Sequence, residues 1–346
     1  MLLQSRFPPR HCPRSTVLSL LAAILVVALA AAAETRRYVP KPEELKYTFA
    51  TAPPVLHLKP GDGLETWTHS AFNDFIYDPE NTSPWDFRPN PNTGPFYIDG
   101  AEPGDTLVVK LIKVEPASEV GYSLAGPGFG ALTKTPFTPM LDQSIPKRLW
   151  TYRIEKQAGT AEFSALDSDL KIKLPLNPFL GCLGVAPADD EARSTIVPGF
   201  YGGNMDTPEV RAGSTIYLPV NVPGALLYLG DGHAVQGEGE ISGTAVEVPM
   251  NVTLTVDLLK GRRITVPRIE DEHYLMAVGS YRPLEDAMRI ASHELIQWLV
   301  EDYGLSALDA YGLLSVAMES NISQLVDPNY TVLVKIKKAY LPPKKQ

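Results

Sequence analysis

Cysteine is nearly absent from this sequence. Cys12 and Cys182 are the only two among 346 residues, and Cys12 lies in an N-terminal segment that we expect to be removed. Cys182 would then be the single thiol of the mature chain, so no disulfide could form within it. It stands in the apolar run FLGCLGVAP without a His or Lys nearby, which favours an inert buried residue over a nucleophile.

An excess of positive charge is also missing. The formal net charge is −9, which argues against a nucleic-acid-binding surface. The motifs G-x-S-x-G and H-E-x-x-H and the Walker loop do not occur in the sequence. The corresponding serine hydrolases, zinc proteases and P-loop nucleotidases are therefore not indicated.

The longest apolar run stands at the N-terminus and is short for a membrane span, which needs about 20 residues. Arg6, Arg10 and Arg14 precede the run VLSLLAAILVVALAAA, which ends in small residues before Glu34. A basic segment, an apolar segment and small residues, in this order, are typical of a secretory signal. We expect residues 1–33 to be a cleaved signal peptide and the protein to be secreted or periplasmic; an uncleaved anchor is the alternative.

The rest of the chain, 34–346, is predicted to be one globular and mainly β unit. The sequence is 44% hydrophobic and 21% charged, as in ordinary globular proteins. The turns PGDG (60–63), PGD (103–105) and AGS (212–214) each lead into an apolar, strand-like run. This pattern predicts antiparallel strands in a sandwich or barrel, which we place at 45–280.

The pattern changes near residue 283, where the segment PLEDAMRIASHELIQWLVEDYGL spaces its apolar residues at helical intervals. Gly304 is placed to end this helix as a C-cap. Ser306 is placed to begin a second helix as its N-cap. We therefore predict a helical hairpin over 283–320, followed by a strand within 330–341.

The densest polar cluster is GDGHAVQGEGEISGTAVE, residues 230–247. Asp231 and His233 are two residues apart, so an extended backbone would place both side chains on one side. A carboxylate with an imidazole suits zinc or a similar divalent cation. The alternative is a polar turn in which Asp231 caps its own backbone. Three further carboxylates follow among the glycines: Glu238, Glu240 and Glu247.

Two other motifs carry candidate site residues. In FYGGNMD, two glycines precede Asn204 and Asp206 and could aim an amide and a carboxylate into a pocket; an ordinary glycine turn is the alternative. In ETWTHSAFNDF, His69 could be a second imidazole ligand and Asp74 its carboxylate partner, next to Asn73. A lone histidine at a strand end is otherwise a surface residue.

Taken in this order, the motifs resemble the acetamidase/formamidase family over about residues 45 to 335. The resemblance implies a jelly-roll-like β-sandwich that hydrolyses short aliphatic amides to carboxylate and ammonia. It also implies a divalent ion such as zinc or calcium and self-association as a homodimer. The chain departs from the family at Tyr201, where some members have a His, and at GEGE, where many have GDGE. The matching segments are NPNTGPFYIDGAEPGD (90–105), FLGCLGVAP (179–187), GGNMD (202–206), 212–247 and LLSVAMESNISQLVDPNYTV (313–332).

Amide hydrolysis needs an activated water, a polarised carbonyl and a proton for the leaving nitrogen. Glu240 or Glu247 would act as the general base, and Asn204 would donate a hydrogen bond to the oxyanion. A secreted β-sandwich binding protein without turnover is the alternative, because a fold does not fix a function. We assign metal ligation to Asp231, His233 and His69, catalysis to Glu240, Glu247 and Asn204, and substrate contacts to Asp206, Asp74 and Asn73.

Overall fold

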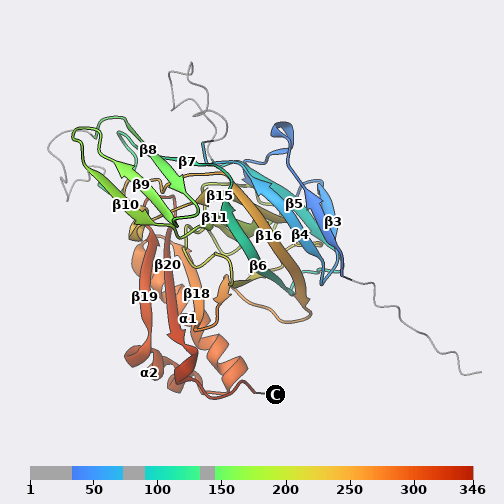
Figure 1. The fold of residues 1–346 in the computed structure, drawn as a ribbon. Helices are drawn as coiled ribbons and strands as arrows, with labels where there is room; N and C mark the ends of the chain where they lie inside the picture. Colours follow the sequence, from blue (N-terminus) through green and yellow to red (C-terminus); the bar gives the residue numbers. More distant parts are fainter. Residues whose placement is uncertain (1–32, 73–89, 133–144, 346) are drawn as a thin grey trace, which may run out of the picture. The chain divides into compact units, whose positions relative to one another are not determined.

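The computed structural model describes residues 33–72, 90–132 and 145–345 (Figure 1). Within these ranges the chain is mainly β, with two helices near its C-terminus, which confirms the fold class predicted from the sequence. Asn73, Asp74 and the predicted signal peptide up to residue 32 lie outside the described residues.

The largest sheet has nine strands in the order β1-β4-β16-β6-β14-β17-β18-β20-β19. Its neighbouring strands are antiparallel, except that β1 and β4 run parallel. The bounds are β1 Thr35–Tyr38, β4 Gly63–Thr68, β6 Thr106–Pro116, β14 Thr215–Pro219, β16 Met250–Leu259, β17 Arg268–Glu270, β18 Tyr274–Tyr281, β19 Glu319–Gln324 and β20 Tyr330–Lys337.

A five-stranded sheet in the order β13-β11-β15-β5-β3 carries much of the candidate site. Its strands are β3 Leu56–Leu58, β5 Asn92–Ile98, β11 Phe179–Val185, β13 Gly202–Asn204 and β15 Leu227–His233. A four-stranded sheet is formed by β7 Val120–Ala125, β8 Arg148–Glu155, β9 Thr160–Ser164 and β10 Lys171–Pro175, and β2 Thr48–Phe49 pairs with β12 Arg193–Ser194.

One apolar core joins the nine-stranded and five-stranded sheets. Leu64 and Leu254 from the first sheet share it with Phe96, Leu183 and Leu229 from the second. Burial alternates along β16, as expected for a strand with one face on a core. Every residue of β11 and of β15 is buried, so polar groups on these two strands are removed from bulk water.

The C-terminal helices are α1 Leu284–Tyr303 and α2 Ala307–Ala317. Gly304 ends α1 in a left-handed conformation with φ of 74°, and the Ser306 side chain caps α2 by accepting the N–H of Asp309, as the sequence predicts. The predicted hairpin ends earlier than residue 320, because β19 already begins at Glu319. None of the helices in the described ranges has the length and apolar character needed to cross a membrane.

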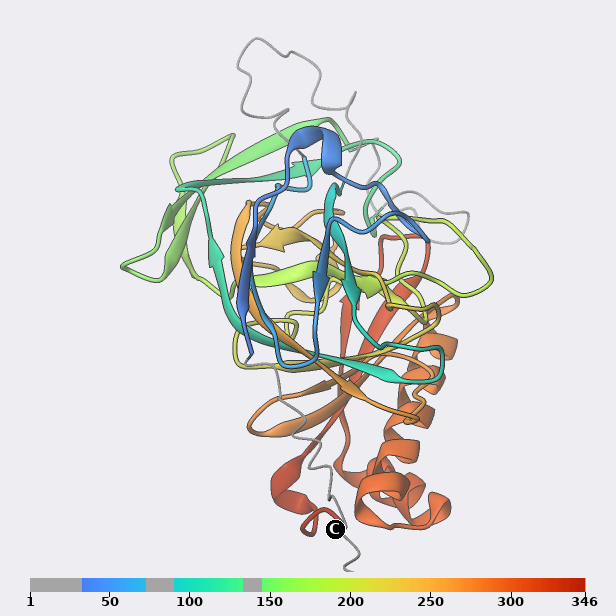
Figure 2. The ribbon, with the colours of Figure 1, turned by 90° about the vertical axis from the view of Figure 1, so that its right-hand side faces the viewer.

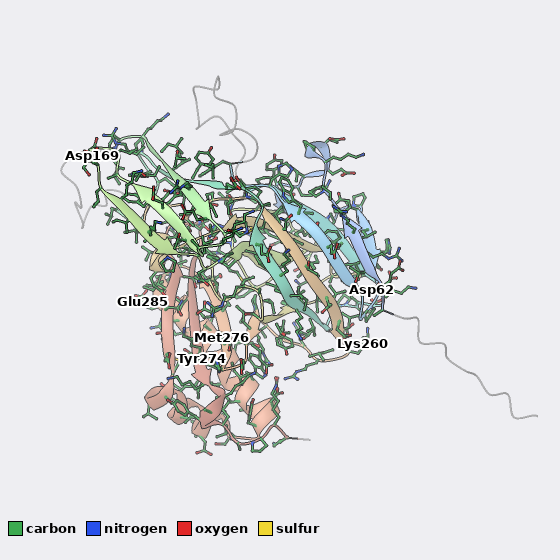
Figure 3. All side chains as sticks on the ribbon, in the orientation of Figure 1. Asp62, Asp169, Lys260, Tyr274, Met276 and Glu285 are labelled. Atoms are coloured by element: carbon green, nitrogen blue, oxygen red, sulfur yellow. The ribbon has the colours of Figure 1, made fainter. Side chains whose placement is uncertain are left out.

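Strand β18 connects the helices to the sandwich (Figures 1 and 2). Leu275 and Ala277 belong to the core beneath α1, which runs beside β18 and β20. Met276, labelled in Figure 3, and Val278 belong to the core of the sandwich. Because successive side chains of a strand point to opposite faces, β18 takes part in both cores.

Candidate active site

The end of β15 brings Asp231 and His233 together with Glu247. His233 Nε2 lies 3.3 Å from Asp231 Oδ1 and 3.2 Å from Glu247 Oε2, and the three side chains are at most 3% exposed. The proximity of Asp231 and His233 agrees with their spacing in the sequence. Asp231 has a φ of 55°, however, so regular strand alternation does not explain it.

Gln236 fixes the orientation of the His233 ring. Gln236 Nε2 donates to the backbone oxygens of Asp206 and Ser323, which leaves its Oε1 2.8 Å from His233 Nδ1. Nδ1 therefore carries the donated proton, and Nε2 faces Asp231 and Glu247. Burial alone would lower the pKa of His233, but the carboxylates of Glu247 and Asp231 outweigh it and raise that pKa well above its usual value.

Three more buried carboxyl groups of the described residues belong to the cluster: Asp206, Glu240 and Asp327. Burial, reinforced by the neighbouring carboxylates, raises the pKa of Asp206 and of Glu240 well above the usual range. Burial likewise raises the pKa of Glu247 and of Asp327 to about 7. Five carboxyl groups beside one imidazole cannot all ionise cheaply, so the cluster must hold protons or a cation.

Asn204 connects the carboxylates. Its Nδ2 donates to Asp206 Oδ2 at 2.9 Å and to Asp327 Oδ2 at 2.7 Å. Its Oδ1 accepts from Asn90 Nδ2 at 2.9 Å and from Cys182 Sγ at 2.7 Å. Both amide hydrogens are thus directed at carboxylates, which favours a positioning residue. Oxyanion donation by Asn204 stays a prediction that would require one of these bonds to break.

Four residues of the site were not assigned a role from the sequence: Asn90, Cys182, Gln236 and Asp327. Asn90 donates to Asp231 Oδ2 at 3.2 Å as well as to Asn204. Burial raises the pKa of Cys182, which keeps its thiol protonated and able to donate. Asn90 and Asp327 lie inside segments that carry the family resemblance. This resemblance was the one feature of the sequence that could have indicated a role for them in the site.

His69 belongs to neither of the possible ligand groups found among the described residues. It is buried just after β4, and its ring meets the ring of Trp67 edge-on with centroids 4.5 Å apart. A metal role for His69 stays a prediction, as do the substrate roles of Asn73 and Asp74. Among the described residues the possible ligand groups are Asp231–His233–Glu247 and Asp206–His233–Glu240.

Four of the eight non-glycine residues with a positive φ among the described residues lie in the cluster. Asn90, Asp206, Asp231 and Glu240 have φ values of 53°, 47°, 55° and 48°. Such conformations cost of the order of 1 kcal/mol each for residues other than glycine, and they persist where surrounding contacts impose them. Four of them within one polar cluster indicate a site built for a function.

The cluster fits a divalent cation. Asp206 Oδ1, Asp231 Oδ1 and Glu247 Oε2 are buried without a hydrogen-bond partner among the described residues. The distances from His233 Nε2 to the last two oxygens, 3.3 and 3.2 Å, are close to the edge of about 3.4 Å in a tetrahedral site with bonds of about 2.1 Å. Gly181 leaves room beside them, because a Cβ there would lie 2.5 Å from both Asp206 Oδ1 and Asp231 Oδ2.

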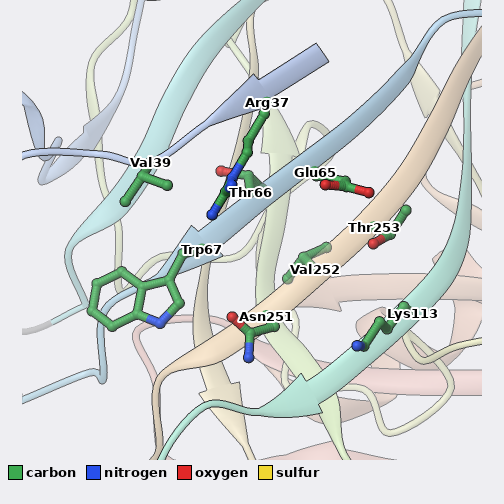
Figure 4. A pocket seen from close by; sticks show the side chains of 9 residues that line it. All are labelled: Arg37, Val39, Glu65, Thr66, Trp67, Lys113, Asn251, Val252 and Thr253. Carbon is green, nitrogen blue, oxygen red and sulfur yellow. The ribbon is translucent and has the colours of Figure 1, made fainter. Parts of the chain in front are cut away.

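The cluster opens on a cavity of about 560 Å³. Asp231, Glu240 and Glu247 are among its lining residues, and apolar side chains line it as well. A different hollow is formed by residues of β1, β4, β6 and β16 and the adjoining Val39 (Figure 4). Among the described residues that line this hollow, Glu65 is the one carboxylate and none is a histidine, so these residues lack the chemistry of the cluster.

The fold and the cluster together define a class of β-sandwich protein with a buried carboxylate–imidazole centre that faces a cavity. The chain belongs to the Acetamidase/Formamidase family, whose model matches residues 52–193 and 188–340. Its structure is similar to that of an acetamidase from Yersinia enterocolitica, with a TM-score of 0.82 and 37% identity over 91% of this chain and 96% of that one.

Curated relatives give the same family. An acetamidase of Mycolicibacterium smegmatis is 30% identical over 217 residues, and a putative formamidase of Schizosaccharomyces pombe is 28% identical over 224 residues. Each match covers 49% of this chain. The chain spans about half the length of these two relatives, 53% and 51% respectively.

Proposed function

We propose that the protein hydrolyses the C–N bond of a short linear amide, giving a carboxylate and ammonia. The observation that carries this proposal is the buried group Asp231–His233–Glu247, in which the two carboxylates line the cavity and each places one oxygen 3.2–3.3 Å from His233 Nε2. The names of the relatives, acetamidase and formamidase, support the same reaction.

Asp231 Oδ1, His233 Nε2 and Glu247 Oε2 would hold a divalent cation. When bound, it supplies the Lewis acidity that an unreactive amide carbonyl and the attacking water require. The imidazole ligand favours zinc over calcium, because calcium is bound in proteins by oxygen ligands. In this arrangement Glu247 changes from a candidate base to a ligand.

Glu240 is the best placed general base. Its side chain lines the cavity and is 7% exposed, so its carboxylate can meet a bound substrate and water. It would take a proton from water as the oxygen attacks the carbonyl carbon, and deliver that proton to the nitrogen as the C–N bond breaks. The resulting carboxylic acid loses its proton to ammonia.

A His233→Gln variant tests the proposal. Purified wild-type protein should release ammonia from formamide or acetamide and contain a divalent metal in elemental analysis. His233→Gln should lose both properties, since a metal ligand and its ring geometry are removed. His293→Gln, on the exposed face of α1, is the matched control and should keep both. Undiminished ammonia release by His233→Gln would contradict the proposed site.

Export and self-association are further parts of the proposal. The basic and apolar order of residues 6–33 supports removal of a signal peptide after Ala33. The fold uses the chain from Glu34 onward, because the N–H of Gly63 donates to the Glu34 oxygen and β1 begins at Thr35. N-terminal sequencing of the exported protein and light scattering of its purified form would test the cleavage point and the homodimer.

A further inference from the structure

One part of the cavity wall is apolar. Phe72 and Leu124 are almost completely buried in a small apolar cluster of their own. The ring of Phe129 is 39% exposed and therefore available for contact. Ile196 and Val326 extend the apolar lining, and the carboxylates of Asp231, Glu240 and Glu247 belong to the same cavity.

Hydrogen bonds tie this apolar wall to the segment that carries the acidic groups. The N–H of Ala131 donates to the Ile241 oxygen at 2.8 Å, and the N–H of Leu124 donates to Thr244 Oγ1 at 2.8 Å. Gly243 leaves space for Phe129, because a Cβ there would lie 2.2 Å from its ring. The apolar wall is therefore held in a fixed place beside the segment from Glu240 to Glu247.

The cavity is large for the smallest amides. Formamide has three non-hydrogen atoms and acetamide four, whereas pockets of roughly 300–1,000 Å³ accommodate drug-sized ligands. The volume of about 560 Å³ leaves room beyond the reacting amide, and much of that room is bounded by apolar side chains. Apolar surface of this kind gains free energy from an alkyl group and none from water.

We propose that the preferred substrate is a primary amide with an apolar acyl chain longer than the methyl group of acetamide. The chain would lie against Phe129, Leu124 and Ile196 while the amide group faces Glu240 and Asp231. This inference rests on the proposed amide hydrolysis. Each methylene buried against the wall should raise kcat/KM about three- to fourfold until the cavity is filled.

A series of amides tests the inference on the purified, metal-containing protein. Ammonia release is measured with formamide, acetamide, butyramide, pentanamide and hexanamide, and with the amide of pentanedioic acid that ends in a carboxylate. We expect kcat/KM to rise from formamide to pentanamide, and the carboxylate-ended amide to fall well below pentanamide. Highest activity on formamide or acetamide would overturn the inference alone. Ammonia from none of these amides would overturn the proposed function with it.

The carboxylate-ended amide tests the role of Arg282, the one cationic side chain among the described residues that line the cavity. Arg282 lines the cavity, donates from Nη2 to the Asp327 backbone oxygen and lies over the Tyr330 ring at 4.1 Å. If this amide matched or exceeded pentanamide, Arg282 would determine specificity and the apolar wall would not. That result would overturn the inference.

Phe129→Ala separates an apolar binding wall from a structural role. The ratio of kcat/KM for hexanamide to that for acetamide should fall about tenfold, and Ile196→Ala should lower it in the same direction. Phe200→Ala is the matched control, because this phenylalanine is 52% exposed and lines a different cavity, and it should keep the wild-type ratio. An equal loss of kcat/KM on all amides in both wall variants would contradict the inference. Thermal unfolding of the variants would show whether reduced stability causes that loss.

Discussion

At the scale of single residues, Asn204 shows how one amide group orients a buried acidic site. Its nitrogen donates to Asp206 and Asp327, and its oxygen accepts from Asn90 and Cys182. These partners fix the orientation of the amide group, with its nitrogen toward the two carboxylates and its oxygen toward Asn90 and Cys182. Removal of the amide leaves two buried carboxylates without their donor and two buried donors without their acceptor.

Asn204→Ala should therefore lower both catalysis and stability. We expect kcat/KM for the best amide to fall by about 10²-fold or more, since displaced acids no longer align with the substrate. We expect the free energy of unfolding to fall by about 1–3 kcal/mol, because buried polar groups lose their partners. Parallel measurements of ammonia release and urea unfolding check both values.

Cys182→Ala is the matched control for Asn204→Ala, since it removes one donor to Asn204 Oδ1 and leaves Asp206 and Asp327 bonded. Both effects should be smaller in this control. If Asn204→Ala lost activity while its stability stayed at the wild-type value, the positioning role would be wrong. The oxyanion role predicted from the sequence would then be the better account.

The sequence predicts those site residues that stand close together in the chain. Asp231, His233, Glu240 and Glu247 share one glycine-rich segment, and their types and spacing point to a metal or acid–base site without a structure. Asp327 cannot be found in this way. It reaches Asn204 across 123 positions, and only the folded sheets bring the two side chains together.

At the scale of secondary structure elements, a glycine in a strand of the site leaves space for the neighbouring carboxylates, because it has no side chain. Strand β11 has Gly181 where a Cβ would lie 2.5 Å from Asp206 Oδ1 and from Asp231 Oδ2, and 3.0 Å from His233 Cε1. Carboxylates on neighbouring elements can approach one another only over such a gap. The glycine is thus needed for the arrangement of the ligands as well as for the strand.

Gly181→Ala should lower the metal content and the kcat of the purified protein by tenfold or more, because the added methyl group displaces the two carboxylates. Elemental analysis and ammonia release check this expectation. Gly312→Ala is the control, because a Cβ at this position in α2 meets nothing within 4 Å. It should leave both properties unchanged and stabilise the helix by about 0.5–1 kcal/mol. Normal metal content in Gly181→Ala would contradict this expectation and show that the carboxylates can bind the metal without the space at Gly181.

Elements are predictable from the sequence where local chemistry specifies them. The two helices have their caps in the sequence, at Gly304 and Ser306, and the structure confirms both. Strand β19 has the sequence ESNISQ, which shows neither apolar alternation nor β-branched enrichment. It is a strand because β20 pairs with it. That pairing cannot be read from the sequence of β19 itself.

At the scale of the whole molecule, a buried ion pair joins α1 to the large sheet. Arg268 Nε on β17 donates to Glu294 Oε1 on α1 at 2.7 Å, and both side chains are at most 3% exposed. The Arg268 guanidinium also lies 5.2 Å from the centroid of the Trp298 ring. Since β18 takes part in both cores, the helices and the sandwich should unfold together.

Glu294→Ala should destabilise the molecule by about 1–3 kcal/mol, because the buried Arg268 guanidinium loses its buried carboxylate partner and keeps only the half-exposed Glu301, whose Oε2 lies 3.0 Å from Arg268 Nη1. Urea unfolding followed by fluorescence and by circular dichroism should show one shared transition at a lower midpoint. Replacing both partners, Arg268→Met with Glu294→Leu, should recover most of the loss, since no charge then remains buried. Arg289→Ala is the surface control, because its pair with Asp286 is exposed and should change stability by less than about 1 kcal/mol. A separate early transition of the helices in Glu294→Ala would show instead that the two cores are independent, and that β18 does not couple them.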